Sequence, residues 1–436
     1  MLNHKAIIIV LLFSLLGNIY IILNNPLKET MGDEAQYIRF SHSVIDWAGK
    51  AKQLFPGFMQ FQMQPPFSYS FYALAANKNI SSANHQFKGT NPNKHWNKDI
   101  AIFFKRVIYI NLILLLVSGF LLYLVGLHIG LKTYFSAISV ALVLLNPRIL
   151  FYVQSLWPEL LHFSLVLLFF LLLFKYLDSK KLIYLIGSSI ILAYCSLTKG
   201  ITGFYFWIAV VLLVYSSWKH QFNRVQVFRT VFLFTVPYLL LINAQKLSNN
   251  ISYNEYIISS NKWYNIELGL KIASGVSSWE IEKIYWRAEP TLREQKSRER
   301  VFQYLSDTPL TDIVQCQIMQ FANRQLNNSF FKTGLERKRW QNSDSLKSYE
   351  STVQDVSWIL IIAGLFGLVF GFFETEKHLF LSGYIGYYLI GLLVVGFNAR
   401  FYIQAIPVLA LFGTFFMQLV YNTLRQIYKK RMSVVK

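Results

Sequence analysis

Apolar runs of about twenty residues recur from one end of the chain to the other, and they limit its fold more than any other feature. A run of that length spans the hydrocarbon core of a bilayer as a helix. Only 15% of the residues are charged, whereas a soluble domain carries about 25%. The sequence therefore predicts an all-α polytopic membrane protein with about ten transmembrane helices. The expected spans are Ala6–Leu23, Ile102–Leu127, Tyr134–Leu150, Leu160–Tyr176, Leu182–Thr198, Ile201–Tyr215, Val227–Ala244, Val353–Phe373, Leu379–Phe397 and Phe401–Tyr421.

Lysine and arginine indicate which side of the membrane each loop occupies. We expect the first run to stay as a helix, since no small-x-small cleavage site follows it. If the N-terminus is cytoplasmic, the short outer loops carry only Arg148, Lys199 and Arg400, and the inner segments carry most of the remaining short-loop charge. The inner residues are Lys5, Lys132, Lys175, Lys180, Lys181, Lys219, Arg224, Arg229, Lys377, Arg425, Lys429, Lys430, Arg431 and Lys436. The net charge of +20 is thus explained by membrane lipids as partners, without nucleic acid.

Two long segments, residues 24–101 and 245–352, fall on the outer side in this topology. We expect three parts. They are an N-terminal transmembrane catalytic module that includes the first outer loop (1–244), an outer helical loop (245–352), and C-terminal transmembrane helices with a basic cytoplasmic tail (353–436). Apolar residues at helical spacing after Asp33 predict a short interfacial helix. Residues 293–326 also favour helix, with a break near Pro309.

Four charged residues lie at the outer ends of these spans: Asp33, Glu159, Lys199 and Arg400. Each has a simple structural explanation. Asp33 can cap a helix, and Glu159 can be a first-turn acid after a proline. Lys199 can extend to the interface, and Arg400 can anchor its span. These explanations do not account for two acids and two bases on one membrane face, because ionisable groups at membrane spans are costly and usually functional.

The four groups suit transfer of a sugar from a lipid phosphate. A carboxylate can accept the proton of an acceptor hydroxyl as a general base. Lysine and arginine can bind a phosphate and offset the charge that develops as it leaves. The lipid tail of such a donor would lie among the helices, with its head group at the outer face.

Five motifs, in order along the chain, resemble the GT-C class of polytopic glycosyltransferases, closest to the protein O-mannosyltransferase and lipid A aminoarabinose transferase group. They are "GDEAQY" around Asp33, the proline pair in "QPPFSYSFYAL", Glu159 opening a later span, "TKG" at 198–200, and "RFY" at 400–402 followed by Pro407. The resemblance covers most of the chain. The second acid is Glu where many relatives have Asp, and Phe67 follows the proline pair where the family has Leu.

The resemblance implies a role for each matching residue. Asp33 would be the catalytic base, with Glu34 supporting the site and Glu159 as the second acid. Lys199 and Arg400 would contact the phosphate of a polyprenyl-phosphate sugar. The pocket would be shaped by Tyr37, Gln64, Pro65, Pro66 and Tyr402. The implied reaction is a single displacement with inversion, in which the acceptor attacks and polyprenyl phosphate leaves.

Several alternatives stay open at this stage. No metal is expected to be required, although adjacent carboxylates such as Asp33 and Glu34 can hold Mg²⁺ or Mn²⁺ weakly. The acceptor can be a lipid, a glycan or a protein, and the donor sugar is not specified. The short loops favour a bacterial inner membrane with the site facing the periplasm or exterior, or the ER membrane in a eukaryote. A transporter or flippase of a lipid-linked sugar, or a non-catalytic component of a glycan assembly complex, would use intramembrane charges as well.

Overall fold

The computed structural model of the chain describes twelve stretches of residues: 4–25, 67–72, 75, 98–146, 149, 152–253, 262–273, 290–320, 343–347, 349–372, 374–395 and 401–435. Within these residues every regular element is a helix and no strand occurs. The all-α class expected from the apolar runs is therefore confirmed for the part of the chain that the structure describes.

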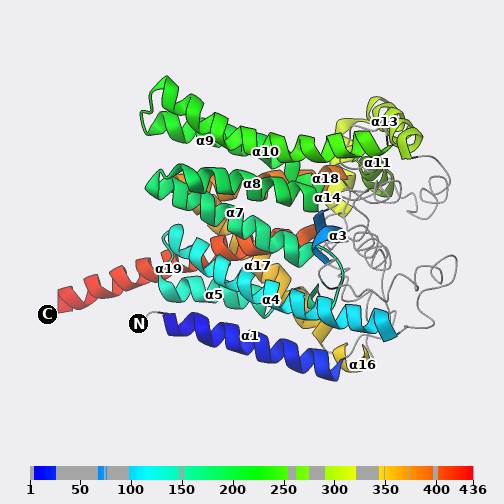
Figure 1. Cartoon of the computed structure of the whole chain (residues 1–436). Coiled ribbons are helices and arrows are strands. Elements are labelled where there is room, and N and C mark those ends of the chain that lie inside the picture. Colours follow the sequence, from blue (N-terminus) through cyan, green and yellow to red (C-terminus); the bar gives the residue numbers. More distant parts are fainter. Residues whose placement is uncertain are drawn as a thin grey trace.

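Ten helices run back and forth through one bundle (Figure 1). Both termini lie at one end of it, which we call the terminal end. The helices of the second long segment lie at the other end, which we call the loop-rich end (Figure 1). The ten helices are α1 (Lys5–Asn24), α4 (Lys98–His128), α5 (Thr133–Leu144), α7 (Glu159–Ser179), α8 (Leu182–Thr198), α9 (Tyr205–Lys219), α10 (Arg224–Tyr253), α17 (Tyr349–Gly371), α18 (Glu376–Val395) and α19 (Ile406–Val435).

Each predicted span overlaps one of these helices. The ends differ most for α19 and α10, which continue 14 and 9 residues beyond the predicted Tyr421 and Ala244. Among the described residues, six stretches are long and apolar enough to cross a bilayer by length and composition, in α1, α4, α7, α9 with the turn before it, α10 and α19. Thr133–Leu144, Leu182–Thr198 and Ile359–Gly371 are apolar but shorter. The chain is thus a multi-pass membrane protein, and the count of ten spans stays a prediction.

The helices differ in how far the protein covers them. The most apolar window of α7 is 78% buried, whereas that of α1 is only 17% buried. Hence α7 is central and α1 is peripheral, in contact with α4 and α5. The few buried residues of α1 include Ser14 and Asn18, and the Asn18 amide donates a hydrogen bond to the Ser14 carbonyl at 2.7 Å.

Close helix packing in the C-terminal part depends on glycine. The helices α17 and α19 are in extensive contact. A Cβ added at Gly367 would overlap the backbone carbonyl of Phe412, and one added at Gly364 would lie 2.9 Å from the carbonyl oxygen of Leu409. Small residues let membrane helices approach closely, so these two glycines fix the α17–α19 distance.

Charged pairs join the helices at the terminal end. The Asp178 carboxylate at the end of α7 contacts the Lys377 ammonium of α18 at 2.5 Å and the His128 ring of α4 at 2.8 Å. Lys377 also donates to the His128 carbonyl at 2.9 Å. The short basic loops predicted to be cytoplasmic therefore lie together, on the same side as both termini (Figure 1).

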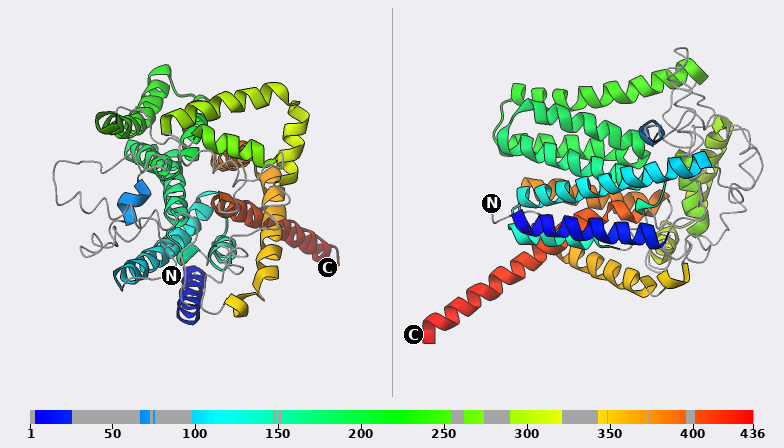
Figure 2. Two further views of the ribbon diagram at one scale, coloured as in Figure 1. Left: turned by 90° about the vertical axis from the view of Figure 1, so that its right-hand side faces the viewer. Right: turned by 60° about the horizontal axis from the view of Figure 1, so that its bottom comes forward.

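The second long segment contributes α11 (Lys262–Ala273), α13 (Pro290–Asp307), α14 (Leu310–Gln320) and α16 (Ser343–Leu346). The break expected near Pro309 is confirmed, because α13 ends and α14 begins on either side of it. Figure 2 shows α13 and α14 lying across the loop-rich end of the bundle. A small apolar cluster of Leu270, Val301 and Ile313 holds α11, α13 and α14 together.

Ionic contacts reinforce this three-helix layer. The Arg300 guanidinium binds the Glu267 carboxylate through two nitrogens, at 2.6 and 3.2 Å. The Glu294 carboxylate accepts hydrogen bonds from the backbone N–H groups of Trp263 and Tyr264 at the start of α11. Free N–H groups at a helix start need such acceptors. The layer also contacts α18, so it is attached to the bundle.

Candidate active site

The hairpin of α7 and α8 brings Glu159 and Lys199 together at the loop-rich end. Glu159 is the first residue of α7, and Lys199 directly follows α8. The Lys199 ammonium lies 2.9 Å from one Glu159 carboxylate oxygen. The Glu159 side chain is fully buried, and that of Lys199 is 10% exposed. A buried ion pair is costly to break because either charge left alone is poorly solvated, so the two residues form one unit.

Three helices hold the turn that follows Lys199. This turn is a short 3-10 helix, η5 (Gly200–Phe204). The His162 ring of α7 is hydrogen-bonded to the Thr202 hydroxyl at 2.6 Å. The Tyr387 hydroxyl of α18 donates to the Ile201 carbonyl, and the Tyr238 hydroxyl of α10 donates to the Gly203 carbonyl at 3.4 Å. The backbone that carries Lys199 is therefore fixed from several sides.

A buried asparagine positions the segment that leads into Glu159. The Asn111 side chain of α4 is fully buried. Its amide nitrogen donates toward the carbonyls of Ser155, Val153 and Tyr152, at 2.6, 3.2 and 3.4 Å. Backbone carbonyls outside a helix need such a donor within a membrane. Asn111 thus stabilises the non-helical approach to α7.

Tyr72 connects this asparagine to the first long segment. Tyr72 lies in the short helix α3 (Phe67–Tyr72), which begins directly after the proline pair. Its hydroxyl donates to the Asn111 side-chain oxygen at 3.0 Å and to the Trp157 carbonyl at 3.2 Å. At the other end of α3, the Phe67 ring packs on the Tyr194 ring of α8, with centroids 4.5 Å apart. The residues after the proline pair therefore contact α8 and the segment directly before α7.

The segment after Arg400 also reaches this region. It forms a 3-10 helix, η7 (Phe401–Gln404), which contacts α7. The Tyr388 hydroxyl of α18 donates to the Gln404 side-chain oxygen at 2.6 Å, and both residues are buried. Tyr388 is also close enough to Glu159 to interact with it electrostatically. Hence η7 lies near the ion pair.

The structure describes only part of the predicted site. It places Glu159 and Lys199 in contact, and it places the backbone of Tyr402 in η7. The other predicted residues lie outside the described residues, and their roles stay predictions. They are Asp33, Glu34, Tyr37, Gln64, Pro65, Pro66 and Arg400.

No metal centre is formed by the residues that the structure describes, since no three His, Cys, Asp or Glu side chains among them come together as ligands would. The described acid nearest the site, Glu159, is engaged by Lys199. Asp33 and Glu34, which are candidate ligands for a divalent cation, are among the residues not described. That no metal is required, with weak Mg²⁺ or Mn²⁺ binding possible at these two acids, stays a prediction.

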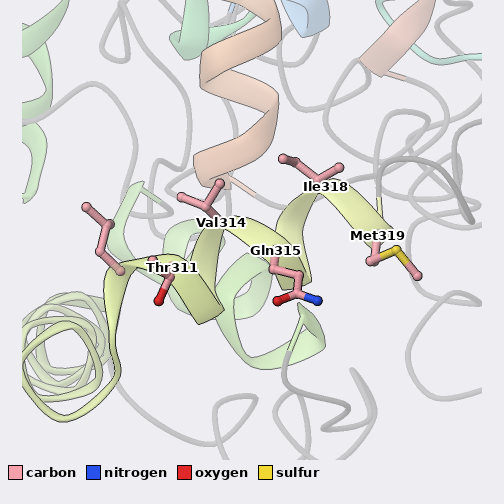
Figure 3. Close-up of a pocket in the computed structure, with 6 residues that line it drawn as sticks. Thr311, Val314, Gln315, Ile318 and Met319 are labelled. Carbon is pink, nitrogen blue, oxygen red and sulfur yellow. The ribbon is translucent and has the colours of Figure 1, made fainter.

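An open apolar groove lies apart from the ion pair, on α14. It has a volume of about 470 Å³ and is lined by Leu310, Thr311, Val314, Gln315, Ile318 and Met319. Figure 3 shows these side chains along one helix of the outer layer. No charged side chain lines the groove, so it lacks groups that could perform acid–base chemistry.

Sequence reasoning missed three residues of this site: His162, Asn111 and Tyr72. A signal existed for His162, because it lies three residues after Glu159 and residues at that spacing share a helix face. The sequence also contained a signal for Asn111, because it is the one amide side chain in the apolar run 102–127. Polar side chains within such runs are usually hydrogen-bonded and functional. Nothing local in the sequence singles out Tyr72.

Known proteins match this chain by structure only. No protein-family model and no curated protein matches its sequence. The oligosaccharyltransferase of Archaeoglobus fulgidus in its apo form is similar over 98% of this chain, with a TM-score of 0.53 and 12% identity. The oligosaccharyltransferase AglB from Archaeoglobus fulgidus, solved with an inhibitory peptide and a dolichol-phosphate, has a TM-score of 0.52 and 13% identity over 98% of this chain. The Archaeoglobus fulgidus oligosaccharyltransferase in complex with zinc and sulfate has a TM-score of 0.51 and 13% identity over 98% of this chain.

These comparisons establish the fold. The chain has the GT-C type of polytopic helical fold, as the sequence motifs implied. It spans about half the length of the archaeal enzymes, 52% of each of the first two. The narrower resemblance to the protein O-mannosyltransferase and aminoarabinose transferase group stays a prediction.

Proposed function

We propose that this protein is a membrane glycosyltransferase that moves a sugar from a polyprenyl-phosphate donor to an acceptor at the loop-rich, extracytoplasmic end of the bundle. The buried Glu159–Lys199 pair is the observation that carries the proposal. Its cation, Lys199, precedes a turn that three helices contact, at the loop-rich end of the bundle. A lysine in that position suits an anionic lipid head group.

The proposed reaction is a single displacement. The acceptor oxygen attacks the anomeric carbon while the bond from that carbon to the phosphate oxygen breaks, and the electron pair leaves on the phosphate. Asp33 accepts the acceptor proton as general base. Lys199 and Arg400 stabilise the additional charge on the departing phosphate. Glu34 supports the site, and Glu159 keeps Lys199 in place.

Two further findings support a lipid-linked donor. One archaeal structure of similar fold contains a dolichol-phosphate and an inhibitory peptide, and another is tethered to an acceptor peptide. In addition, α3 packs on α8 through Phe67 and Tyr194. The motif that contains the proline pair is therefore adjacent to the helix that ends at Lys199.

The test is turnover of radiolabelled polyprenyl-phosphate sugars by the purified protein in lipid, with wild type beside Asp33→Asn. We expect sugar release or transfer by the wild type, and a loss of 10²-fold or more in the variant, as removal of a general base commonly causes. Asp312→Asn is the matched control, because Asp312 is an exposed acid on α14, away from the ion pair.

Three outcomes separate the alternatives. Turnover that falls in Asp33→Asn and persists in Asp312→Asn supports the proposal. Equal turnover in wild type and Asp33→Asn excludes Asp33 as the base. Donor binding by the wild type with no turnover, over a panel of sugars and acceptors, favours a flippase or a scaffold.

A further inference from the structure

Gln404 is buried near the ion pair, and one end of its side chain has no partner. It lies in η7, which contacts α7, and only 1% of the residue is exposed. Its side-chain oxygen accepts a hydrogen bond from the Tyr388 hydroxyl at 2.6 Å. That length is usual for O–H···O and short for N–H···O, so the amide nitrogen is the other end. Among the described residues, no atom accepts a hydrogen bond from this nitrogen.

The unpaired amide nitrogen needs an explanation. A buried NH₂ group that has lost water and gained no partner destabilises the fold. Buried polar side chains nearly always have a partner, so each exception has a cause. The bond to Tyr388 is not that cause, because a carboxylate or hydroxyl oxygen would accept it equally well. What glutamine adds at this position is the NH₂ donor itself.

The neighbours of Gln404 indicate which group this donor would bind. Tyr388 lies close enough to Glu159 to interact with it electrostatically, and Glu159 contacts the Lys199 ammonium at 2.9 Å. Gln404 and Lys199 are therefore connected through two intervening side chains. A ligand held by both would need one oxygen for a cation and another for a neutral NH₂ group. A phosphate presents more than one such oxygen.

We propose that the Gln404 amide donates a hydrogen bond to a phosphate oxygen of the lipid-linked donor, beside Lys199. The inference rests on the proposed function, and it adds a phosphate contact to Lys199 and Arg400. Because the Lys199 side chain is 10% exposed and Gln404 is covered, the phosphate meets Lys199 first, and Gln404 engages as neighbouring side chains adjust. A hydrogen bond to a charged oxygen that also pairs a buried donor raises the affinity about tenfold or more.

A second buried glutamine provides a matched control. Gln418 lies in α19 and is 8% exposed. Its oxygen accepts from the backbone N–H of Lys132 at 2.7 Å, and its nitrogen donates to the Gly130 carbonyl at 3.1 Å. Both ends are therefore paired, at the terminal end of the bundle. Methionine at either position removes the same polar groups with little change in side-chain length.

The experiment compares polyprenyl phosphate with polyprenol, which lacks the phosphate, so that no sugar needs to be known. Binding of each lipid to the purified protein is measured in neutral nanodiscs at pH 7.5, and Tm is measured alongside. We expect the wild type to prefer the phosphate. Gln404→Met should bind polyprenyl phosphate about tenfold or more weakly and polyprenol as the wild type does. Gln418→Met should show the opposite pattern, with the larger fall in Tm and an unchanged phosphate preference.

Gln404→Glu is a second variant, which decides the question where Gln404→Met does not fold. It keeps the size of the side chain and an oxygen for Tyr388, but it has no NH₂ group, so it should also lose the phosphate preference.

Three results overturn the inference. A folded variant at position 404 that keeps the wild-type preference refutes it, while the proposed function stands. An equal loss of affinity for both lipids refutes it too, because this would show a structural role for Gln404. A wild type that binds polyprenyl phosphate no more tightly than polyprenol overturns the proposed function and this inference together.

Discussion

Replacing Asn111 by leucine tests whether the approach to Glu159 is held by one side chain. Leucine has nearly the same size, so the change removes hydrogen bonds without leaving a large cavity. The lost contacts are those with the carbonyls of Tyr152, Val153 and Ser155, and the one accepted from the Tyr72 hydroxyl. Tyr72 retains its bond to the Trp157 carbonyl.

The loss can be worked out from these contacts. The amide nitrogen has two protons, so it makes two good hydrogen bonds at a time, and the oxygen makes a third. Each is worth about 0.6–1 kcal/mol net in membrane or soluble proteins. A buried carbonyl left unsatisfied adds about 1 kcal/mol. We therefore expect Asn111→Leu to lower the free energy of unfolding by about 2–4 kcal/mol.

The assay can use the protein's own cysteines. The chain has two, of which Cys195 is buried and Cys316 is partly exposed. In a Cys316→Ser background, a thiol-reactive dye reports unfolding through Cys195 alone. An unfolding entropy of about 2.1 cal/mol/K per residue over 436 residues converts the expected loss into a fall in Tm on the order of 3 °C.

The matched control is Ile113→Ala on the same helix, because the Ile113 side chain is 61% exposed toward the lipid. It should leave Tm within about 1 °C of the background. Both variants are heated at one scan rate, since membrane proteins often unfold irreversibly. Equal midpoints for Asn111→Leu and Ile113→Ala would refute the claim that Asn111 holds this segment.

Three further predictions follow from described contacts. His162→Ala and Thr202→Val should each reduce donor turnover. The double variant should lose less activity than the two single losses combined, with a coupling energy of about 1 kcal/mol in a double-mutant cycle. Full additivity of the two losses would show that their hydrogen bond does not position Lys199. Gly367→Ala should destabilise the protein by more than 3 kcal/mol in thermal unfolding, because its methyl group would overlap the backbone of α19. Gly386→Ala is the control and should be neutral, because no atom lies near the new methyl group. Asp178→Asn should cost less than about 1 kcal/mol by the same measurement, since its carboxylate is 44% exposed and exposed ion pairs contribute little; a loss above 2 kcal/mol would contradict this.

The sequence predicted the helices well because hydrophobicity over twenty residues is a local property. It also predicted the break at Pro309, since a proline after "DT" cannot continue a helix. The contact between Glu159 and Lys199 could also have been predicted from the sequence. The "SKK" turn makes α7 and α8 a hairpin, and Glu159 and Lys199 stand at similar distances from that turn, so their side chains meet at its open end.

Contacts between distant segments were not predictable in this way. The bonds from Asn111 to the carbonyls near Tyr152, and from Tyr387 to the turn after Lys199, depend on which helices are neighbours. A single sequence does not contain that information, because many pairings of ten apolar helices bury similar surface. The residues that complete the predicted site, above all Asp33 and Arg400, lie outside the described part of the chain and stay predictions.

The peripheral place of α1 has a consequence for how the protein is made. This helix precedes α4 and α5 in the chain, so it enters the bilayer before they have been synthesised. Its insertion therefore depends on its own lipid-facing residues, such as Phe13 and Leu16, which remain largely uncovered in the finished bundle. Asn18, its buried amide, is bonded to the Ser14 carbonyl within the same helix. The helix can thus remain in the membrane with the Asn18 amide hydrogen-bonded until later helices insert and cover that side chain.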